Sequence, residues 1–237
     1  MNEIEKLRGA ANQLKYPAGI MRNVGHDING LGFFPGANGT FDNSTIISNK
    51  PIMILGQDQD NEKGFAKSCK VGNESYSPTW TNLRALLEKA HINEAECFFT
   101  NCIMGIRLKT TKNTGKSPAH GYPDFLKECL VILEEQIRIQ KPKLIISLGR
   151  IPAKLLSVIS KDLLLKFIAI DEFKEIDQWD FAVNRGIEFD NIPAFKTNMV
   201  VLYHPSFRAL NIIKRQRIAH SSGIDPEVEM LREILKN

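Results

Sequence analysis

The sequence predicts an α/β fold, a three-layer sandwich in which helices flank a central four-stranded parallel sheet. Four short apolar runs of strand length occur at about residues 51–56, 96–101, 143–148 and 198–203. Segments with helical periodicity separate them. Strands that are buried on both faces are nearly continuous apolar runs, and helical crossovers between strands favour parallel pairing. These two observations indicate a parallel sheet with helices on both of its faces.

The helices are predicted from start signals, apolar spacing and stop signals. Pro78-Thr79-Trp80-Thr81 opens a helix that runs to about His91, and a second helix with a period of 3.6 ends at Gln140 because Pro142 stops it. Further helices are expected at about 151–160, 206–219 and 225–236. Residues 161–197 are expected to hold a helix and a short ribbon around residues 184–186.

Length and composition indicate one domain over residues 1–237, with residues 1–50 as an N-terminal extension packed on it. The chain has 237 residues, of which 43% are hydrophobic, and this is enough for one sizeable core. Its formal net charge of +4 is compatible with a polyanionic partner. No apolar run approaches the roughly 20 residues that span a bilayer, and the charged N-terminus has no signal-peptide pattern. We therefore expect a cytoplasmic protein without a membrane partner.

The four cysteines are expected to be buried thiols that bind no metal. They stand at positions 69, 97, 102 and 129, so no pair has the C-x-x-C spacing of a metal or redox site. In a cytosolic chain, isolated cysteines usually behave as small apolar residues.

Polar clusters follow three of the predicted strands. Gln57 and Asp58 follow the first strand, Asn101 ends the second, and His204-Pro205-Ser206 follows the last. Ligands of open parallel sheets bind outside the carboxyl ends of the strands. A carboxylate, an amide and an imidazole are therefore expected to meet in one site. Taken singly, each also has a structural interpretation: an Asp that caps a turn, an Asn that ends a strand, or a structural His.

Five segments, in this order along the chain, resemble motifs of the uracil-DNA glycosylase superfamily. The segments are Gly56-Gln57-Asp58-Gln59-Asp60, the Pro-containing stretch 77–83, Phe99-Thr100-Asn101, the third strand from Pro142 to Gly149, and His204-Pro205-Ser206. The resemblance covers roughly residues 50–215. It implies a four-stranded parallel sheet between helices and an enzyme that removes a base from DNA.

Departures from the family pattern concern the target base and a metal cluster. Gln59 replaces the usual Pro of the first motif, and Asp60 stands where the best-known branch has a Tyr that screens out the thymine methyl group. The iron–sulfur branch has four cluster cysteines with an early C-x-x-C, which this chain lacks, and Gly105 lies near the place of a third. We therefore expect no cofactor and no metal, and the base that is removed stays open.

The resemblance and the chemistry of glycosidic cleavage together suggest a role for each site residue. Asp58 would orient the attacking water, and His204 would donate a hydrogen bond to the base as negative charge develops there. Asn101 would read the uracil edge, with its oxygen accepting from N3–H and its NH₂ donating to O4. Gln57 would also contact the base, and Phe65 would stack on it, with Phe33, Phe34 and Trp80 as rival stackers.

A second set of residues is expected to hold the DNA strand. Pro78, Thr79, Ser206 and Arg208 are candidates for binding the phosphates that flank the lesion. Phe207 or Leu210 would wedge into the gap that the base leaves. Lys214, Arg215 and Arg217 form a basic run that is either a solvated helix face or part of the DNA-binding surface.

The function expected from the sequence is a monofunctional glycosylase that hydrolyses the N-glycosidic bond of uracil, or of a related deaminated base, flipped out of single- or double-stranded DNA. The protein is expected to act as a monomer. One alternative is a non-catalytic binder of single-stranded or modified DNA on the same fold, which the departures at Gln59 and Asp60 motivate. Another is a hydrolase of free nucleosides or another small ligand.

Overall fold

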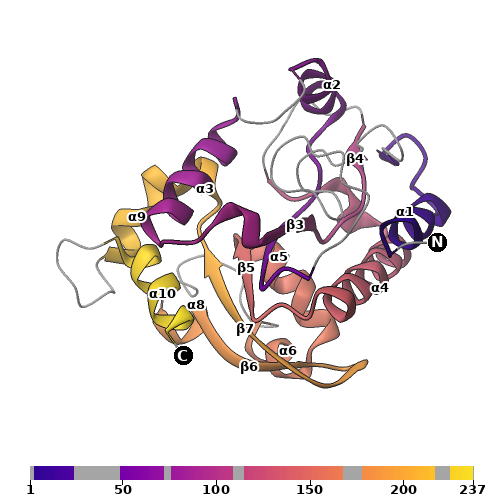
Figure 1. The fold of residues 1–237 in the computed structure, drawn as a ribbon. Coiled ribbons are helices and arrows are strands. Elements are labelled where there is room, and N and C mark those ends of the chain that lie inside the picture. Colours follow the sequence, from indigo (N-terminus) through magenta and orange to yellow (C-terminus); the bar gives the residue numbers. More distant parts are fainter. Residues whose placement is uncertain are drawn as a thin grey trace.

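A five-stranded, mostly parallel sheet forms the centre of the protein (Figure 1). The structure is a computed structural model, and it describes residues 3–23, 49–71, 76–108, 115–167, 178–216 and 225–236. The strand order in this sheet is β3-β2-β5-β7-β6. The five strands are β2 (Ile52–Gly56), β3 (Cys97–Asn101), β5 (Leu144–Leu148), β6 (Val183–Phe189) and β7 (Ile192–Leu202).

The four predicted strands are confirmed as β2, β3, β5 and β7, and they are parallel to one another. Every residue of β2, β3 and β5 is buried, as their apolar sequences require in a sheet covered on both faces. The predicted count of four is one short. β6 is a fifth, antiparallel strand at the edge, and it forms a hairpin with β7 that turns at residues 190–191, whereas the sequence analysis placed a ribbon around residues 184–186. β6 was not predicted as a strand of the sheet because exposed residues lie between its buried ones, so it forms no continuous apolar run.

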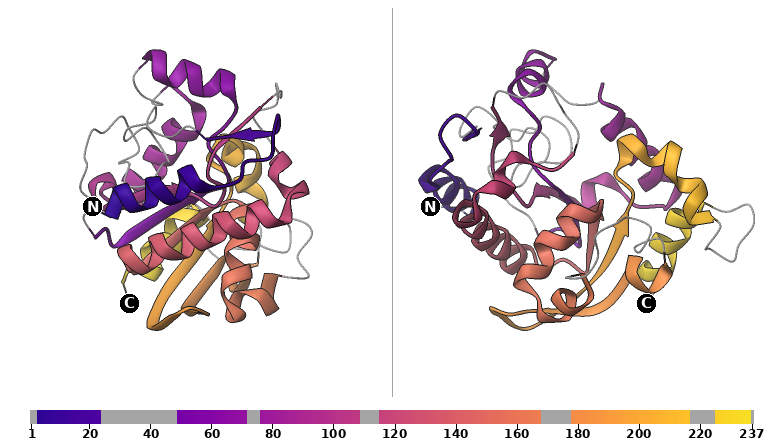
Figure 2. Two further views of the ribbon diagram at one scale, coloured as in Figure 1. Left: turned by 90° about the vertical axis from the view of Figure 1, so that its right-hand side faces the viewer. Right: turned by 180° about the vertical axis from the view of Figure 1, so that it is seen from behind.

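Helices cover both faces of the sheet (Figures 1 and 2). On one side lie α3, α9 and α10, and on the other lie α4, α5 and α6, with α1 packed outside α4. The α-helices are α1 (Glu3–Gln13), α2 (Glu62–Val71), α3 (Pro78–Lys89), α4 (Pro123–Gln140), α5 (Arg150–Leu156), α6 (Lys161–Phe167), α8 (Trp179–Ala182), α9 (Arg208–Gln216) and α10 (Pro226–Leu235). This arrangement confirms the three-layer α/β class.

Short elements complete the described part of the chain. Four of them are 3-10 turns, and two are strands that pair antiparallel outside the main sheet. They are β1 (Met21–Arg22), η2 (Glu94–Glu96), β4 (Ile106–Arg107), η3 (Pro118–Gly121), η4 (Ser157–Ile159) and η5 (Pro205–Phe207). Of these short elements, β4 follows β3 and η5 follows β7 along the chain.

The N-terminal helix shares the core of the sheet domain. Leu7 and Ala11 of α1 are buried in the central hydrophobic cluster, and Tyr16 packs on Phe125 of α4 with ring centroids 5.2 Å apart. Phe33 and Phe34 lie outside the described residues. Among the helices that the structure describes, none has the length and apolar character needed to cross a bilayer.

Candidate functional site at the carboxyl edge of the sheet

The polar clusters after β2, β3 and β7 come together at one edge of the sheet. Gly56, at the end of β2, pairs in register with Asn101, at the end of β3. Leu148, at the end of β5, pairs with Leu202 of β7, and a Cβ built on Gly149 would lie 3.8 Å from Cβ of His204. The loops that follow these strands therefore begin side by side, as the sequence predicts from the parallel topology.

Asp58 forms a buried, two-pronged ion pair with Arg107. Arg107 Nε donates to Oδ2 of Asp58 at 2.6 Å, and a terminal nitrogen of the same guanidinium donates to Oδ1 at 3.0 Å. The two side chains are only 4% and 5% exposed. Each carboxylate oxygen can still accept another hydrogen bond, for example from a water. Arg107 therefore fixes the position of Asp58 and offsets part of its charge.

Backbone hydrogen bonds join the loop after β2 to the loop after β3. The amides of Cys102 and Ile103 donate to the carbonyls of Gly56 and Gln57, at 3.0 and 2.9 Å. Further along, the amide of Arg107 donates to the carbonyl of Asp60 at 2.9 Å. The backbone of Arg107 is thus hydrogen bonded to the first motif, residues 56–60, which contains Asp58.

Gln57 uses both ends of its side chain to hold the loop that precedes α4. Its Nε2 donates to the carbonyl of Gly115 at 3.0 Å, and its Oε1 accepts from the amide of Ser117 at 3.2 Å. The side chain of Gln57 thus anchors this loop. A contact with a base, through its backbone or its side chain, stays a prediction.

His204 is half-buried and is oriented by Ser206. The Nδ1 atom of His204 and Oγ of Ser206 are hydrogen bonded at 2.8 Å. Burial lowers the pKa of His204; the nearby carboxylate of Asp58 acts in the opposite direction, and Arg107 acts with burial. The mutual influence of these charges places the imidazole and the ion pair in one electrostatic environment. His204 is therefore neutral at pH 7.

Asn101 and the candidate stackers differ in their surroundings. Asn101 is 2% exposed at the end of β3, beside the first motif. Phe65 is 9% exposed on α2 within the hydrophobic cluster, and the guanidinium of Arg22 lies 5.7 Å from its ring centroid. Trp80 is 1% exposed and packs on Phe99, so it is a core residue. A base that stacked on the same face of Phe65 would compete with Arg22 for that ring.

The four predicted phosphate ligands divide into two pairs. Pro78 and Thr79 form the first turn of α3, where Pro78 is exposed and Thr79 half-buried. One turn further on, Asn82 donates to the carbonyl of Pro205 at 2.8 Å, so this helix end lies near the His204 loop. Ser206 instead contacts His204. Arg208 forms ion pairs with two carboxylates of the protein itself.

Arg208 and Arg215 belong to a buried charge cluster around Glu227 on α10, which we call the Glu227 cluster. Glu227 is 0% exposed and accepts from Nε of Arg208 at 2.6 Å and from a terminal nitrogen of Arg215 at 3.0 Å. It also accepts from the amide of Tyr203 at 2.6 Å, and Arg208 pairs with Asp225 as well. The phosphate role predicted for Arg208 does not match these contacts.

The predicted basic run on α9 is likewise broken by burial. Arg215 is 1% exposed, and its guanidinium lies 4.6 Å from the ring centroid of Tyr203. Lys214 is exposed, and Arg217 lies outside the described residues. The residues of this helix that do face solvent are mostly apolar: Phe207, at the preceding turn, is 41% exposed, Leu210 76% and Ile213 56%.

Asp60 lies back against helix α2. It has a left-handed backbone with φ of 74°, and a Cβ built on Gly64 would come within 1.9 Å of its Oδ2. Its Oδ1 is buried without a hydrogen-bond partner among the described residues. Burial raises the pKa of Asp60, and the charge of Asp58 adds to this effect. The residue that replaces the Tyr of the motif thus packs on the first turn of α2.

The residues present do not fit an iron–sulfur cluster. Within the described ranges, no three His, Cys, Asp or Glu side chains are grouped as metal ligands. Cys97, Cys102 and Cys129 are buried as predicted, whereas Cys69 is exposed. Burial raises the pKa of Cys129 to about 12, which opposes the thiolate that a metal needs. At Gly105, a Cβ would lie 2.7 Å from a ring carbon of Tyr16, so that side chain occupies the space of a larger residue.

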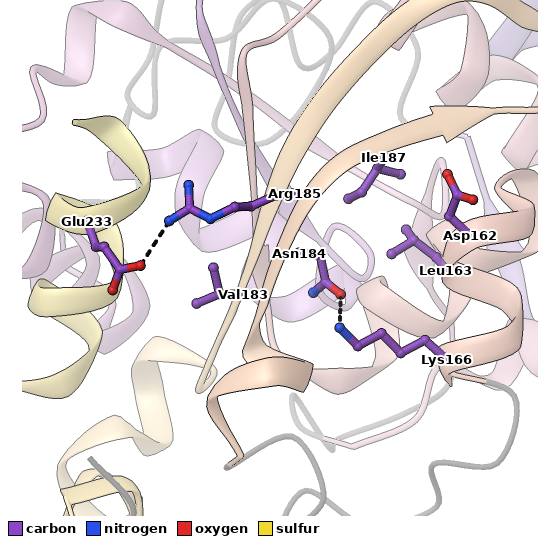
Figure 3. A pocket seen from close by; sticks show the side chains of 8 residues that line it. All are labelled: Asp162, Leu163, Lys166, Val183, Asn184, Arg185, Ile187 and Glu233. Carbon is purple, nitrogen blue, oxygen red and sulfur yellow. Dashed lines mark hydrogen bonds and ion pairs between the residues drawn. The ribbon is translucent and has the colours of Figure 1, made fainter. Parts of the chain in front are cut away.

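A separate open pocket lies on the edge strand β6, between α6 and α10 (Figure 3). One hydrogen bond and one ion pair cross its wall: Lys166 donates to Oδ1 of Asn184 at 2.7 Å, and Arg185 pairs with Glu233 at 2.9 Å. None of the predicted site residues lines it.

Three residues of the candidate site and the Glu227 cluster were not predicted from the sequence. They are Arg107, His120 and Glu227. Burial, together with the cations of Lys116 and Arg107, lowers the pKa of His120, while Asp58 acts in the opposite direction. Arg107 and Glu227 are far in sequence from Asp58 and Arg208, and nothing in a local pattern marks such residues. In the sequence, Arg107 looks like part of a basic loop, and Glu227 looks like an ordinary acidic residue in the first turn of a helix.

The fold and the site define an α/β protein with a carboxylate, an amide and an imidazole at the carboxyl edge of a parallel sheet. The sequence model of the uracil DNA glycosylase superfamily matches residues 45–220. The chain belongs to this superfamily, whose members are generally glycosylase hydrolases that act on DNA. The resemblance proposed from the motifs is thereby confirmed. No curated protein matches the chain significantly.

Proposed function

We propose that the protein is a metal-free DNA glycosylase that hydrolyses the N-glycosidic bond of uracil, or of a related deaminated base, flipped out of DNA. The observation that carries the proposal is the shared environment of Asp58 and His204 beside Asn101, in a member of this superfamily. A carboxylate can support the positive charge that develops on the sugar, and a neutral imidazole can donate a hydrogen bond to the departing base.

In the proposed reaction, the bond between C1′ of the sugar and the base nitrogen breaks, and the base keeps the bonding electrons. Asp58 supports the positive charge that develops on the sugar and orients a water, whose oxygen bonds to C1′ and whose proton passes to the carboxylate or to solvent. Because Arg107 engages both oxygens of Asp58, we infer that the carboxylate acts mainly by position and charge.

His204 would stabilise the departing base. When the Ser206 hydroxyl donates to Nδ1, Nε2 carries the hydrogen of the neutral ring and can donate it to a carbonyl oxygen of the base. A neutral donor suits this role because it strengthens its bond as negative charge develops on the base. Ser206 is then a positioning residue for His204.

Asn101 would select the base by its hydrogen-bonding edge. Its amide matches the N3–H and O4 of uracil, whereas cytosine presents the reverse pattern and would leave two polar groups mismatched. Each such mismatch costs on the order of 1–3 kcal/mol in a buried site.

The test is cleavage of a labelled DNA strand that contains a single uracil, followed by alkali, which cuts the strand at an abasic site. We expect scission with the wild-type protein and not with a strand that has cytosine at the same place. No scission with uracil or any other deaminated base, at enzyme in excess over DNA, would rule out the proposed catalysis.

A second candidate is a non-catalytic binder of single-stranded or modified DNA. The ion pair favours it, because Arg107 donates to both oxygens of Asp58 and offsets part of the charge that would act on the water and the sugar. Asp58→Asn distinguishes the two: a binder keeps its affinity for DNA and shows no abasic product in either form, whereas an enzyme loses its cleavage activity. Asp124→Asn, an exposed change at the start of α4, is the matched control.

A further inference from the structure

His120 lies on the turn η3, which the candidate site holds in place. Gln57 bonds to Gly115 and Ser117, and Arg107 donates to the carbonyl of Gly115 at 3.3 Å. Ser117 then caps the turn, since its Oγ accepts from the amide of Ala119 at 3.4 Å. Two residues of the candidate site, Gln57 and Arg107, therefore hold the short loop before His120 in place.

The Nε2 atom of His120 is a polar atom that the fold buries. It has no hydrogen bond within the described part of the chain, although the atom is shielded from solvent. Buried polar groups of folded proteins are nearly always bonded, so an exception calls for a ligand or a function.

Two charged groups that act on His120 also act on His204. Asp58 and Arg107 act on both imidazoles, and burial lowers the pKa of each. The exposed Lys116 lowers the pKa of His120 further. His120 is therefore a neutral ring, which can either donate or accept at Nε2.

We propose that His120 is a second substrate-contacting imidazole, and that its Nε2 bonds to the polar edge of the nucleotide held at this centre. An uncharged ring suits a carbonyl or ring nitrogen of a base better than it suits a phosphate, which favours cations. The proposal rests on the proposed function, since it takes the ligand to be the flipped base. It adds a contact that none of the sequence motifs includes.

Two substitutions test whether the nitrogen matters. The Gln side chain of His120→Gln can place an amide near the position of Nε2, whereas the Asn of His120→Asn is too short. We expect His120→Asn to lower kcat/KM on a uracil-containing strand about tenfold, the effect of one lost hydrogen bond, and His120→Gln to restore most of it. His91→Asn, an exposed histidine with φ of 58° that Asn tolerates, should match the wild type. Equal activity of His120→Asn and wild type, or equal losses in the Asn and Gln variants, would overturn the proposal.

A second measurement separates this proposal from the proposed function. The ring-nitrogen NMR signals are recorded before and after adding a strand with 2′-fluoro-2′-deoxyuridine, in which the glycosidic bond resists cleavage. We expect the signals of His120 and His204 to shift while that of His91 stays. If the wild type cleaves uracil-containing DNA and the His120 signal does not move, the contact is refuted while the function stands. A shift without cleavage supports the contact and refutes the catalysis, and no binding and no cleavage refutes both.

Discussion

Two buried groups of carboxylates and arginines lie on either side of His204 in the chain, and they differ in what surrounds them. The Asp58–Arg107 pair adjoins two neutral histidines and the buried carboxylate of Asp60. The Glu227 cluster instead ties α10 to α9 and to the end of β7, through Arg208, Arg215 and the amide of Tyr203. The first group lies at the carboxyl edge of the sheet, where the loops after β2 and β3 meet, and the second binds elements of the fold together. The Asp58–Arg107 pair thus belongs to the candidate site, whereas the similar ion pairs of the Glu227 cluster hold the fold together.

The largest effect is expected from Asp58→Asn. This change keeps the shape of the side chain and removes the charge that supports the developing cation on the sugar. Under the proposed function, the single-turnover rate of uracil release should fall roughly 100-fold or more. The rate is measured with enzyme in excess over a uracil-containing strand. A variant that retains most of the wild-type rate would assign the Asp58–Arg107 pair to the fold, like the Glu227 cluster.

Glu227→Gln is expected to act on stability. It leaves the guanidinium groups of Arg208 and Arg215 without the buried carboxylate that they share. Removing one partner of a buried ion pair typically lowers the free energy of unfolding by about 3–5 kcal/mol. Denaturant-induced unfolding, followed by circular dichroism, measures the change.

The control for that change is Glu233→Gln on the same helix. Glu233 pairs with Arg185 at the surface, with 46% of its side chain exposed, and such pairs contribute at most about 1 kcal/mol. Equal losses of stability in the two variants would show that the Glu227 cluster has no special role in the fold.

The lowered pKa values of two histidines predict how the free energy of unfolding depends on pH. Burial lowers the pKa of both His120 and His204 below the ordinary 6.5. Below pH 6.5 the unfolded chain therefore takes up protons more readily than the folded protein does, so the free energy of unfolding should fall as the pH drops through that range. Above pH 6.5 this contribution is fully present and flat.

The check is a series of unfolding curves between pH 5 and pH 8 for the wild type and for His204→Asn. The variant should show a weaker dependence on pH in the acidic half of the series, because it has one such group fewer. An identical dependence in both proteins would contradict the neutral, buried state of His204.

The smallest effect is expected from Lys214→Ala on DNA binding. Lys214 is the exposed cation of a helix whose neighbouring Arg215 is buried in the Glu227 cluster. If α9 faces DNA, the change should weaken binding a few-fold and reduce the slope of log affinity against log salt by about 1. Fluorescence anisotropy at several salt concentrations measures the slope. An unchanged slope would place Lys214 away from the strand.

The parallel strands and their polar ends were predictable because continuous apolar runs and the residues that follow them are local signals. Asp58, Asn101 and His204 were found in this way. The partners that decide the roles of side chains were not predictable, because they come from distant segments. Arg107 reaches Asp58 across 49 positions, and Glu227 reaches Arg208 across 19. Arg208, which looks like a DNA contact in the sequence, is thereby paired with two carboxylates of α10 and its N-cap in the fold.

In the proposed function, the loops after β2, β3 and β7 hold a single flipped nucleotide. The most direct measurement is a crystal structure of the protein bound to a strand that contains 2′-fluoro-2′-deoxyuridine. We predict that the uracil ring lies within hydrogen-bonding distance of Asn101 and His204, with its sugar beside Asp58. A uracil that stays stacked in the strand, or that binds in the pocket between α6 and α10, would contradict the claim.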